Sequence, residues 1–277
     1  MIQRKFDTKI INGKPLVDSL ELLSKMTRVS KKISDSHLEE NEKNWVAFNE
    51  KNRFGYIENQ HDLEDFHFGS YNKTFQKWFM GEKKFCAARN SCEVVAVYNA
   101  LLNMKLVDEE HNFPKILNYF EKNATILKGY FGTSFSGIIK FFKRNGFEYK
   151  WVCGKNITRE KVDEIEANFE TYLFMSYNNI ENIVDMIHTM CVTKEEKGFF
   201  IHNAFNGLIY FTSLYDAVVK YNEVNGWKSR PIIVMGVNRP IKEEKNEKDQ
   251  KNTNNHYICY CDDIASYSLY RRRKFKF

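Results

Sequence analysis

Residues 92–102 limit most strongly how this chain can fold, because they are apolar around most of a helix. Their sequence, CEVVAVYNALL, has apolar residues at helical spacing and fills the positions between them with valine and alanine. A helix that is hydrophobic on all sides has to be buried. We therefore expect this helix to lie at the centre of its domain, with other elements packed around it.

The first turn of this expected helix carries a cysteine. Asn90 is a typical N-cap residue and Glu93 follows three residues later, which is the spacing of a capping box. Cys92 then lies at the helix N-terminus, where the dipole favours a thiolate, the nucleophilic form of cysteine. We therefore interpret Cys92 as a candidate nucleophile, with a plain buried core cysteine as the alternative.

The second half of the chain has the pattern of an antiparallel sheet. Helical patterns cover 137–144, 158–169 and 213–222, and strand patterns cover 147–152, 172–177, 183–193, 198–205, 207–211 and 231–238. A mainly helical first half followed by antiparallel strands predicts an α+β fold. In this fold the Cys92 helix would pack against the sheet.

One of the seven histidines stands out as a partner for the cysteine. A catalytic cysteine needs an imidazole that accepts its proton. Alternation along a strand pattern places His188 on one face with Met186 and Met190, and this face is apolar. A histidine on such a face is either a satisfied core residue or a catalytic one.

Asn203 is the candidate residue to orient His188. A charged turn at 194–198 makes the two strand patterns a hairpin, and Asn203 falls near the end of the second strand. An amide oxygen there would accept from one imidazole nitrogen and fix the tautomer. We interpret His202, on the opposite face, as structural, and Asn206, beyond the strand, as the weaker alternative.

These segments resemble the papain-like cysteine peptidases, with the closest similarity to the bacterial C39-like branch. The resemblance rests on the SCEVVAVYNAL motif around Cys92, the HTMCV segment from His188 and the strand that ends at Asn203, and it covers about 81–238. It implies a papain-like fold in which Cys92 is the nucleophile, His188 the general base and acid, and Asn203 the orienting residue.

The chain departs from the family in its oxyanion donor. Papain-like enzymes usually carry a glutamine shortly before the cysteine, whose amide stabilises the oxyanion. Cys86 stands at that place here, so Gln76 and Asn90 are the candidate donors. The resemblance implies a thiol peptidase, and two alternatives stay open: a papain-fold binding or regulatory module with little or no activity, and a transglutaminase-like thiol acyltransferase.

Composition and charge divide the chain into four parts. With 43% hydrophobic and 15% aromatic residues among 277, the chain is typical of a globular protein. We expect an N-terminal extension at 1–70, packed on the core or acting as a pro-region, and a peptidase domain at 71–240. A charged loop or linker at 241–255 and a C-terminal strand with a basic tail at 256–277 would follow.

The remaining features limit cofactors, partners and location. No cofactor is expected, and no metal site either, because the His256-x-x-Cys259-x-Cys261 pattern lacks a fourth ligand. The substrate would be a peptide or protein, and the basic tail at 270–277 would bind an acidic partner rather than nucleic acid, since the net charge is only +6. Without a signal peptide or an apolar span, we expect a cytoplasmic protein with reduced cysteines, secretion by another route staying open.

Overall fold

The computed structural model describes residues 13–52, 55–78, 85–177, 187–204, 210–224 and 231–240. All of these described residues belong to the first of two units into which the chain divides, which spans residues 1–241. The expected charged loop at 241–255 and the C-terminal strand and tail at 256–277 lie outside the described residues. The same holds for two parts of the expected strands, at 183–186 and 205–209.

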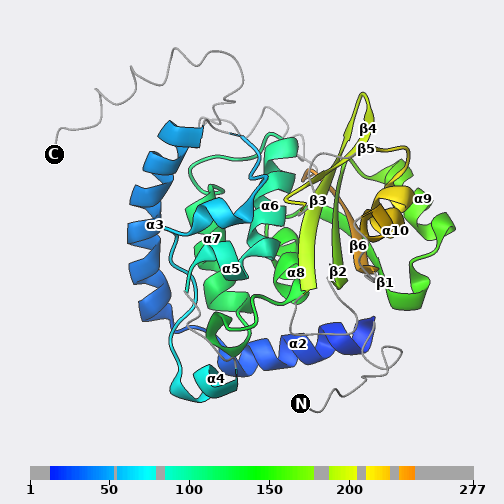
Figure 1. The fold of residues 1–277 in the computed structure, drawn as a ribbon. Helices are drawn as coiled ribbons and strands as arrows, with labels where there is room; N and C mark the ends of the chain where they lie inside the picture. Colours follow the sequence, from blue (N-terminus) through cyan, green and yellow to red (C-terminus); the bar gives the residue numbers. More distant parts are fainter. Residues whose placement is uncertain are drawn as a thin grey trace, which may run out of the picture. The chain divides into compact units, whose positions relative to one another are not determined.

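A six-stranded antiparallel sheet forms the framework of the first unit (Figure 1). Its order is β1-β6-β2-β3-β4-β5, and the hairpin predicted around the 194–198 turn joins β3 to β4. The predicted α+β class is confirmed. The strands are β1 Glu148–Cys153, β2 Thr171–Tyr177, β3 Ile187–Glu195, β4 Gly198–His202, β5 Tyr210–Phe211 and β6 Pro231–Asn238.

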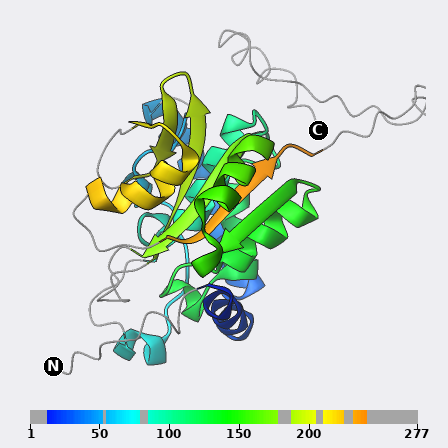
Figure 2. The ribbon, with the colours of Figure 1, turned by 90° about the vertical axis from the view of Figure 1, so that its right-hand side faces the viewer.

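Helices cover both faces of this sheet, as two views at right angles show (Figures 1 and 2). One face carries α6 Cys92–Asn103, with α7 Phe113–Ala124 and α8 Phe135–Arg144 beside it. The other face carries α9 Arg159–Asn168 and α10 Leu214–Val224. The remaining helices are α2 Lys14–Thr27, α3 Lys31–Asn52, α4 Lys73–Trp78, α5 Ala87–Asn90 and the short 3-10 turns η1 Gln60–Leu63, η2 Leu127–Gly129 and η3 Gly154–Asn156.

The central position predicted for the apolar helix is confirmed. All residues from Val94 to Leu101 are fully buried. α6 packs against β3 and β2 on one side and against α7 on the other. This burial on all sides explains why the segment has no polar face.

The N-terminal helices pack on this helical layer. Trp45 of α3 stacks on Phe113 of α7 with ring centroids 5.4 Å apart, and the Asn41 amide bonds both the main-chain N–H and the carbonyl of His67. The described part of the first seventy residues is thereby joined to the core by apolar and polar contacts. None of the described helices is long and apolar enough to cross a membrane.

Candidate active site around Cys92

Cys92 is the first residue of α6, as predicted, but the helix is not capped as predicted. The capping-box prediction is wrong: Asn90 ends the short helix α5, and Ser91 is the N-cap of α6. The Ser91 hydroxyl donates to the Ala87 carbonyl at 2.7 Å, and Asn90 makes no hydrogen bond with its side chain among the described residues. Because α5 leads almost directly into α6, Asn90 is itself helical and cannot adopt the extended conformation that a capping residue needs.

Glu93 points into the protein beside the thiol. Its buried carboxylate oxygen Oε2 accepts hydrogen bonds from the Thr133 hydroxyl at 2.7 Å and from Cys92 Sγ at 3.1 Å. Burial raises the pKa of Glu93 above its ordinary value, although these hydrogen bonds oppose that shift. The Glu93 side chain thus bonds to Thr133, in the loop before α8, and does not cap the start of α6.

Cys92 is a neutral thiol in this arrangement. Burial raises its pKa well above the ordinary value of a cysteine, and the neighbouring Glu93 carboxylate raises it further. The prediction that the helix dipole favours a thiolate is therefore wrong for this state of the site. Half of an elementary charge at a helix end does not outweigh desolvation together with an adjacent carboxylate.

His188 is buried near the start of β3, on the face predicted for it. Strand alternation places its side chain with Met190 and Val192, which belong to the core beneath α9 and α10. Its Nε2 lies 2.7 Å from the main-chain carbonyl oxygen of Asn203. Burial lowers the pKa of His188 to about 4, so the ring is neutral. Since a carbonyl only accepts, Nε2 carries the hydrogen and Nδ1 is the basic nitrogen.

Asn203 lies beside His188, but it contacts the ring through its main chain. The sequence predicted that its side-chain amide orients the imidazole. In the structure, the main-chain carbonyl makes this contact, while the amide oxygen accepts from the Gln60 main-chain N–H at 3.0 Å. Asn203 directly follows β4 and has a left-handed φ of 60°, so the strand alternation used in the prediction no longer holds there.

Cys92 approaches β3 at the residue next to His188. Sγ of Cys92 lies 3.9 Å from the carbonyl oxygen of Ile187, the residue before His188. Strand alternation, however, directs Thr189 toward α6 and His188 toward the opposite face. Among the described residues the thiol bonds to Glu93 and Ile187 rather than to the imidazole. The structure thus places the two candidate residues close together in the fold without joining them by a hydrogen bond.

Unpartnered polar atoms accumulate in this region. Four of its residues have buried side-chain oxygen or nitrogen atoms without a hydrogen-bond partner among the described residues: Asn90, Ser176, Tyr177 and Thr189. Ser176 and Tyr177 stand opposite His188 and Ile187 in the β2–β3 register. Each such atom costs about 1–3 kcal/mol unless water or a ligand satisfies it.

The remaining candidates occupy other places. Gln76 lies on α4, where its side chain is outside the described part, and Asn206 is also outside it. His202 is structural, as predicted: its Nδ1 contacts Glu58 at 2.7 Å and its Nε2 contacts Thr193 at 2.8 Å. The sequence analysis missed Gln60, which contacts Asn203. Nothing in the polar sequence around Gln60 indicates this long-range contact.

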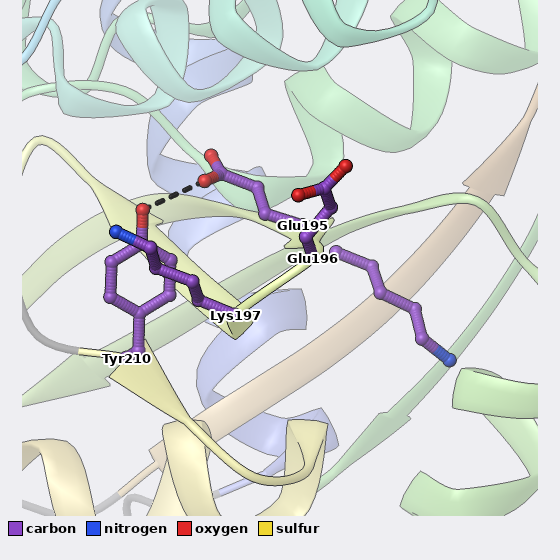
Figure 3. Close-up of a pocket in the computed structure, with 5 residues that line it drawn as sticks. Glu195, Glu196, Lys197 and Tyr210 are labelled. Carbon is purple, nitrogen blue, oxygen red and sulfur yellow. Dashed lines mark hydrogen bonds between the residues drawn. The ribbon is translucent and has the colours of Figure 1, made fainter.

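A separate hollow lies at the turn between β3 and β4, at the other end of β3 from His188 (Figure 3). The Tyr210 hydroxyl donates to Glu195 at 2.8 Å across it. Its lining is mostly charged and consists of Lys194, Glu195, Glu196, Lys197 and Tyr210. The four charged side chains belong to the turn predicted at 194–198 and Tyr210 lies in β5, and none of them contributes to the cysteine site.

Comparison with known proteins adds no family assignment. No family model matches the chain, and neither curated proteins nor solved structures give a significant match. Within the described ranges, no three His, Cys, Asp or Glu side chains are grouped so that they could hold a metal ion.

The low pKa of His188 predicts a loss of stability in acid. Its value rises from about 4 in the folded protein to 6.5 when the chain unfolds, so between these pH values the unfolded chain binds a proton that the folded protein excludes. The resulting destabilisation begins as the pH falls through 6.5 and reaches roughly 3 kcal/mol near pH 4. Urea unfolding across this range should show a steeper pH dependence for the native protein than for His188→Gln. Equal slopes would contradict the assignment of a neutral buried ring.

Proposed function

We propose that this protein is a papain-like thiol enzyme, and specifically a cysteine peptidase. The observation that carries the proposal is the position of Cys92, at the first residue of a buried central helix and 3.9 Å from the main chain just before His188. The Nε2–H of His188 is held by a carbonyl, which leaves Nδ1 as the base. The resemblance of the sequence around both residues to papain-like peptidases supports the same assignment.

The proposed reaction follows from these roles. The Cys92 side chain turns from Glu93 toward β3, and the start of β3 has to rearrange so that the His188 ring, which strand alternation directs to the opposite face in this structure, meets the thiol. Nδ1 of His188 then accepts the thiol proton, and Sγ bonds to the peptide carbonyl carbon. The tetrahedral intermediate breaks its C–N bond as His188 returns the proton to the leaving amine. A water molecule, deprotonated by His188, then attacks the thioester carbon; the C–S bond breaks, the acid is released, and His188 returns the proton to Sγ. The same thioester would serve acyl transfer if an amine replaced the water.

Asn90 is the proposed oxyanion donor. Its amide is buried close to Cys92 in the chain and has no partner among the described residues. The main-chain N–H of Cys92, at the first position of a helix, is one of the groups that a helix leaves without an internal partner. These two groups would together donate to the oxyanion, with the Asn90 amide in place of the missing glutamine. Loss of one such donor costs about 10²–10³ in turnover in other enzymes.

A binding or regulatory module is the second candidate function. The hydrogen bond from the Cys92 thiol to a buried carboxylate favours it, because this contact keeps the sulfur protonated. In that case the papain-like fold would bind a peptide or protein without cleaving it. The two candidate functions differ in the reactivity of Cys92.

Covalent labelling separates the two candidates. The full chain is treated with the epoxide inhibitor E-64 near neutral pH, and the adduct is counted by intact mass and located by peptide mapping. The peptidase proposal expects one adduct, on Cys92, that is absent in Cys92→Ala and unchanged in Cys153→Ala, which removes a more exposed free cysteine. No adduct, or an adduct on Cys153, would refute it and favour the binding module.

A further inference from the structure

The main chain at Asn203 is held in an uncommon conformation. Its φ of 60° is left-handed, a region that asparagine tolerates better than most residues. In this conformation the carbonyl of Asn203 reaches Nε2 of His188 at 2.7 Å. The hydrogen bond to the ring therefore depends on how the residue after β4 is held.

The side chain of Asn203 is held by Gln60. The main-chain N–H of Gln60 donates to Oδ1 of Asn203 at 3.0 Å, and Nδ2 of Asn203 donates to Oε1 of Gln60 at 3.3 Å. The amide nitrogen of Gln60 donates in turn to the Ala88 carbonyl at 3.0 Å. Gln60 thus links the residue that orients His188 to α5, the short helix that leads into Cys92.

The segment that carries Gln60 is fixed on both sides. The main-chain N–H and carbonyl of Ile57 bond to the Asn99 amide of α6 at 2.9 and 3.0 Å. The Glu58 carboxylate accepts from the main-chain N–H of Asn203 at 3.4 Å and contacts His202. Residues 57–60 therefore connect the cysteine helix with the end of β4, which gives Gln60 a defined position.

We infer that Gln60 is a positioning residue of the thiol site. It holds Asn203 so that the carbonyl of Asn203 fixes His188 as the Nε2–H tautomer and keeps Nδ1 as the basic nitrogen. The inference rests on the proposed function for its consequence in catalysis. It also makes a structural claim about the His188 ring, which is testable whether or not the protein cleaves peptides.

The test uses Gln60→Met, which keeps the length of the side chain and removes its two side-chain hydrogen bonds, to Asn203 and Ala88, while the main-chain N–H bond to Asn203 remains. Nitrogen NMR of the histidine rings in the full chain should show His188 as the Nε2–H tautomer in the native protein and as a mixture in Gln60→Met. The rate of Cys92 alkylation should fall about tenfold, as when the outer partner of a ligating histidine is lost. Asn203→Gly permits the same φ but lacks the side-chain amide, so it should also give a mixed His188 tautomer and slower alkylation of Cys92. The double variant should show no larger change than the single variants.

Asn59→Ala is the matched control. It removes the cap of η1, where the Asn59 side chain accepts from the His61 N–H, and leaves the bonds of Gln60 in place. It should not alter the His188 tautomer. An unchanged tautomer in Gln60→Met, or an equal change in Asn59→Ala, would overturn the positioning role. By contrast, unreactive Cys92 in the native protein would overturn the proposed function and leave the tautomer test valid.

Discussion

His188→Gln is expected to slow the acylation of Cys92 by a peptide-based thiol probe by about 10²–10⁴-fold, the usual contribution of a general base. The reason lies in the resting state of the thiol. Because burial and Glu93 raise its pKa, little thiolate exists near neutral pH, and attack requires that a base accept the proton during the reaction. Glutamine keeps a polar side chain of similar size at this position but cannot accept the proton.

The measurement is the second-order rate constant of labelling as a function of pH. His202→Gln is the matched control, since His202 is also buried, lies on the neighbouring strand and bonds through its ring nitrogens to Thr193 and Glu58. Its rate should stay within a few-fold of the native value as long as the variant remains folded. Equal rates for the native protein and His188→Gln would show that another group accepts the thiol proton, and the proposed role of His188 would fail.

The elements that local periodicity determines could be predicted from the sequence. The apolar character of residues 92–102 requires a buried helix, and the alternation around His188 gives its correct face. Thr158 caps α9 through the Lys161 N–H, as its position in the sequence indicates. Such features depend on residues within a few positions of one another, so a single sequence contains them.

The contacts that define the site are long-range, and no pattern in the sequence predicts them. Glu93 has the spacing of a capping box, yet its carboxylate binds Thr133, forty residues further along the chain. Gln60 contacts Asn203 over a separation of 143 residues. Asn203 reaches His188 through its carbonyl because its φ is left-handed, a backbone property that strand alternation cannot predict. Tertiary contacts therefore override the local motif at each of these positions.

The second large effect concerns Glu93, whose carboxylate accepts a hydrogen bond from the sulfur at 3.1 Å. A carboxylate that accepts the thiol hydrogen stabilises the neutral thiol and repels a thiolate. Removing its charge should therefore lower the pKa of Cys92. Burial stays the larger cause of the raised pKa of Cys92, but the Glu93 carboxylate adds to it, so Glu93→Gln should speed alkylation of Cys92 near neutral pH by about tenfold.

The pH dependence of alkylation tests this expectation. In Glu93→Gln the rise in rate should begin at a lower pH than in the native protein. Glu121→Gln is the control, because Glu121 is an equally buried carboxylate that bonds His37 and Gly69 away from the sulfur. It should leave the profile of Cys92 unchanged. A slower reaction in Glu93→Gln would mean that the carboxylate accepts the thiol proton, which would make Glu93 the base of this site in place of His188.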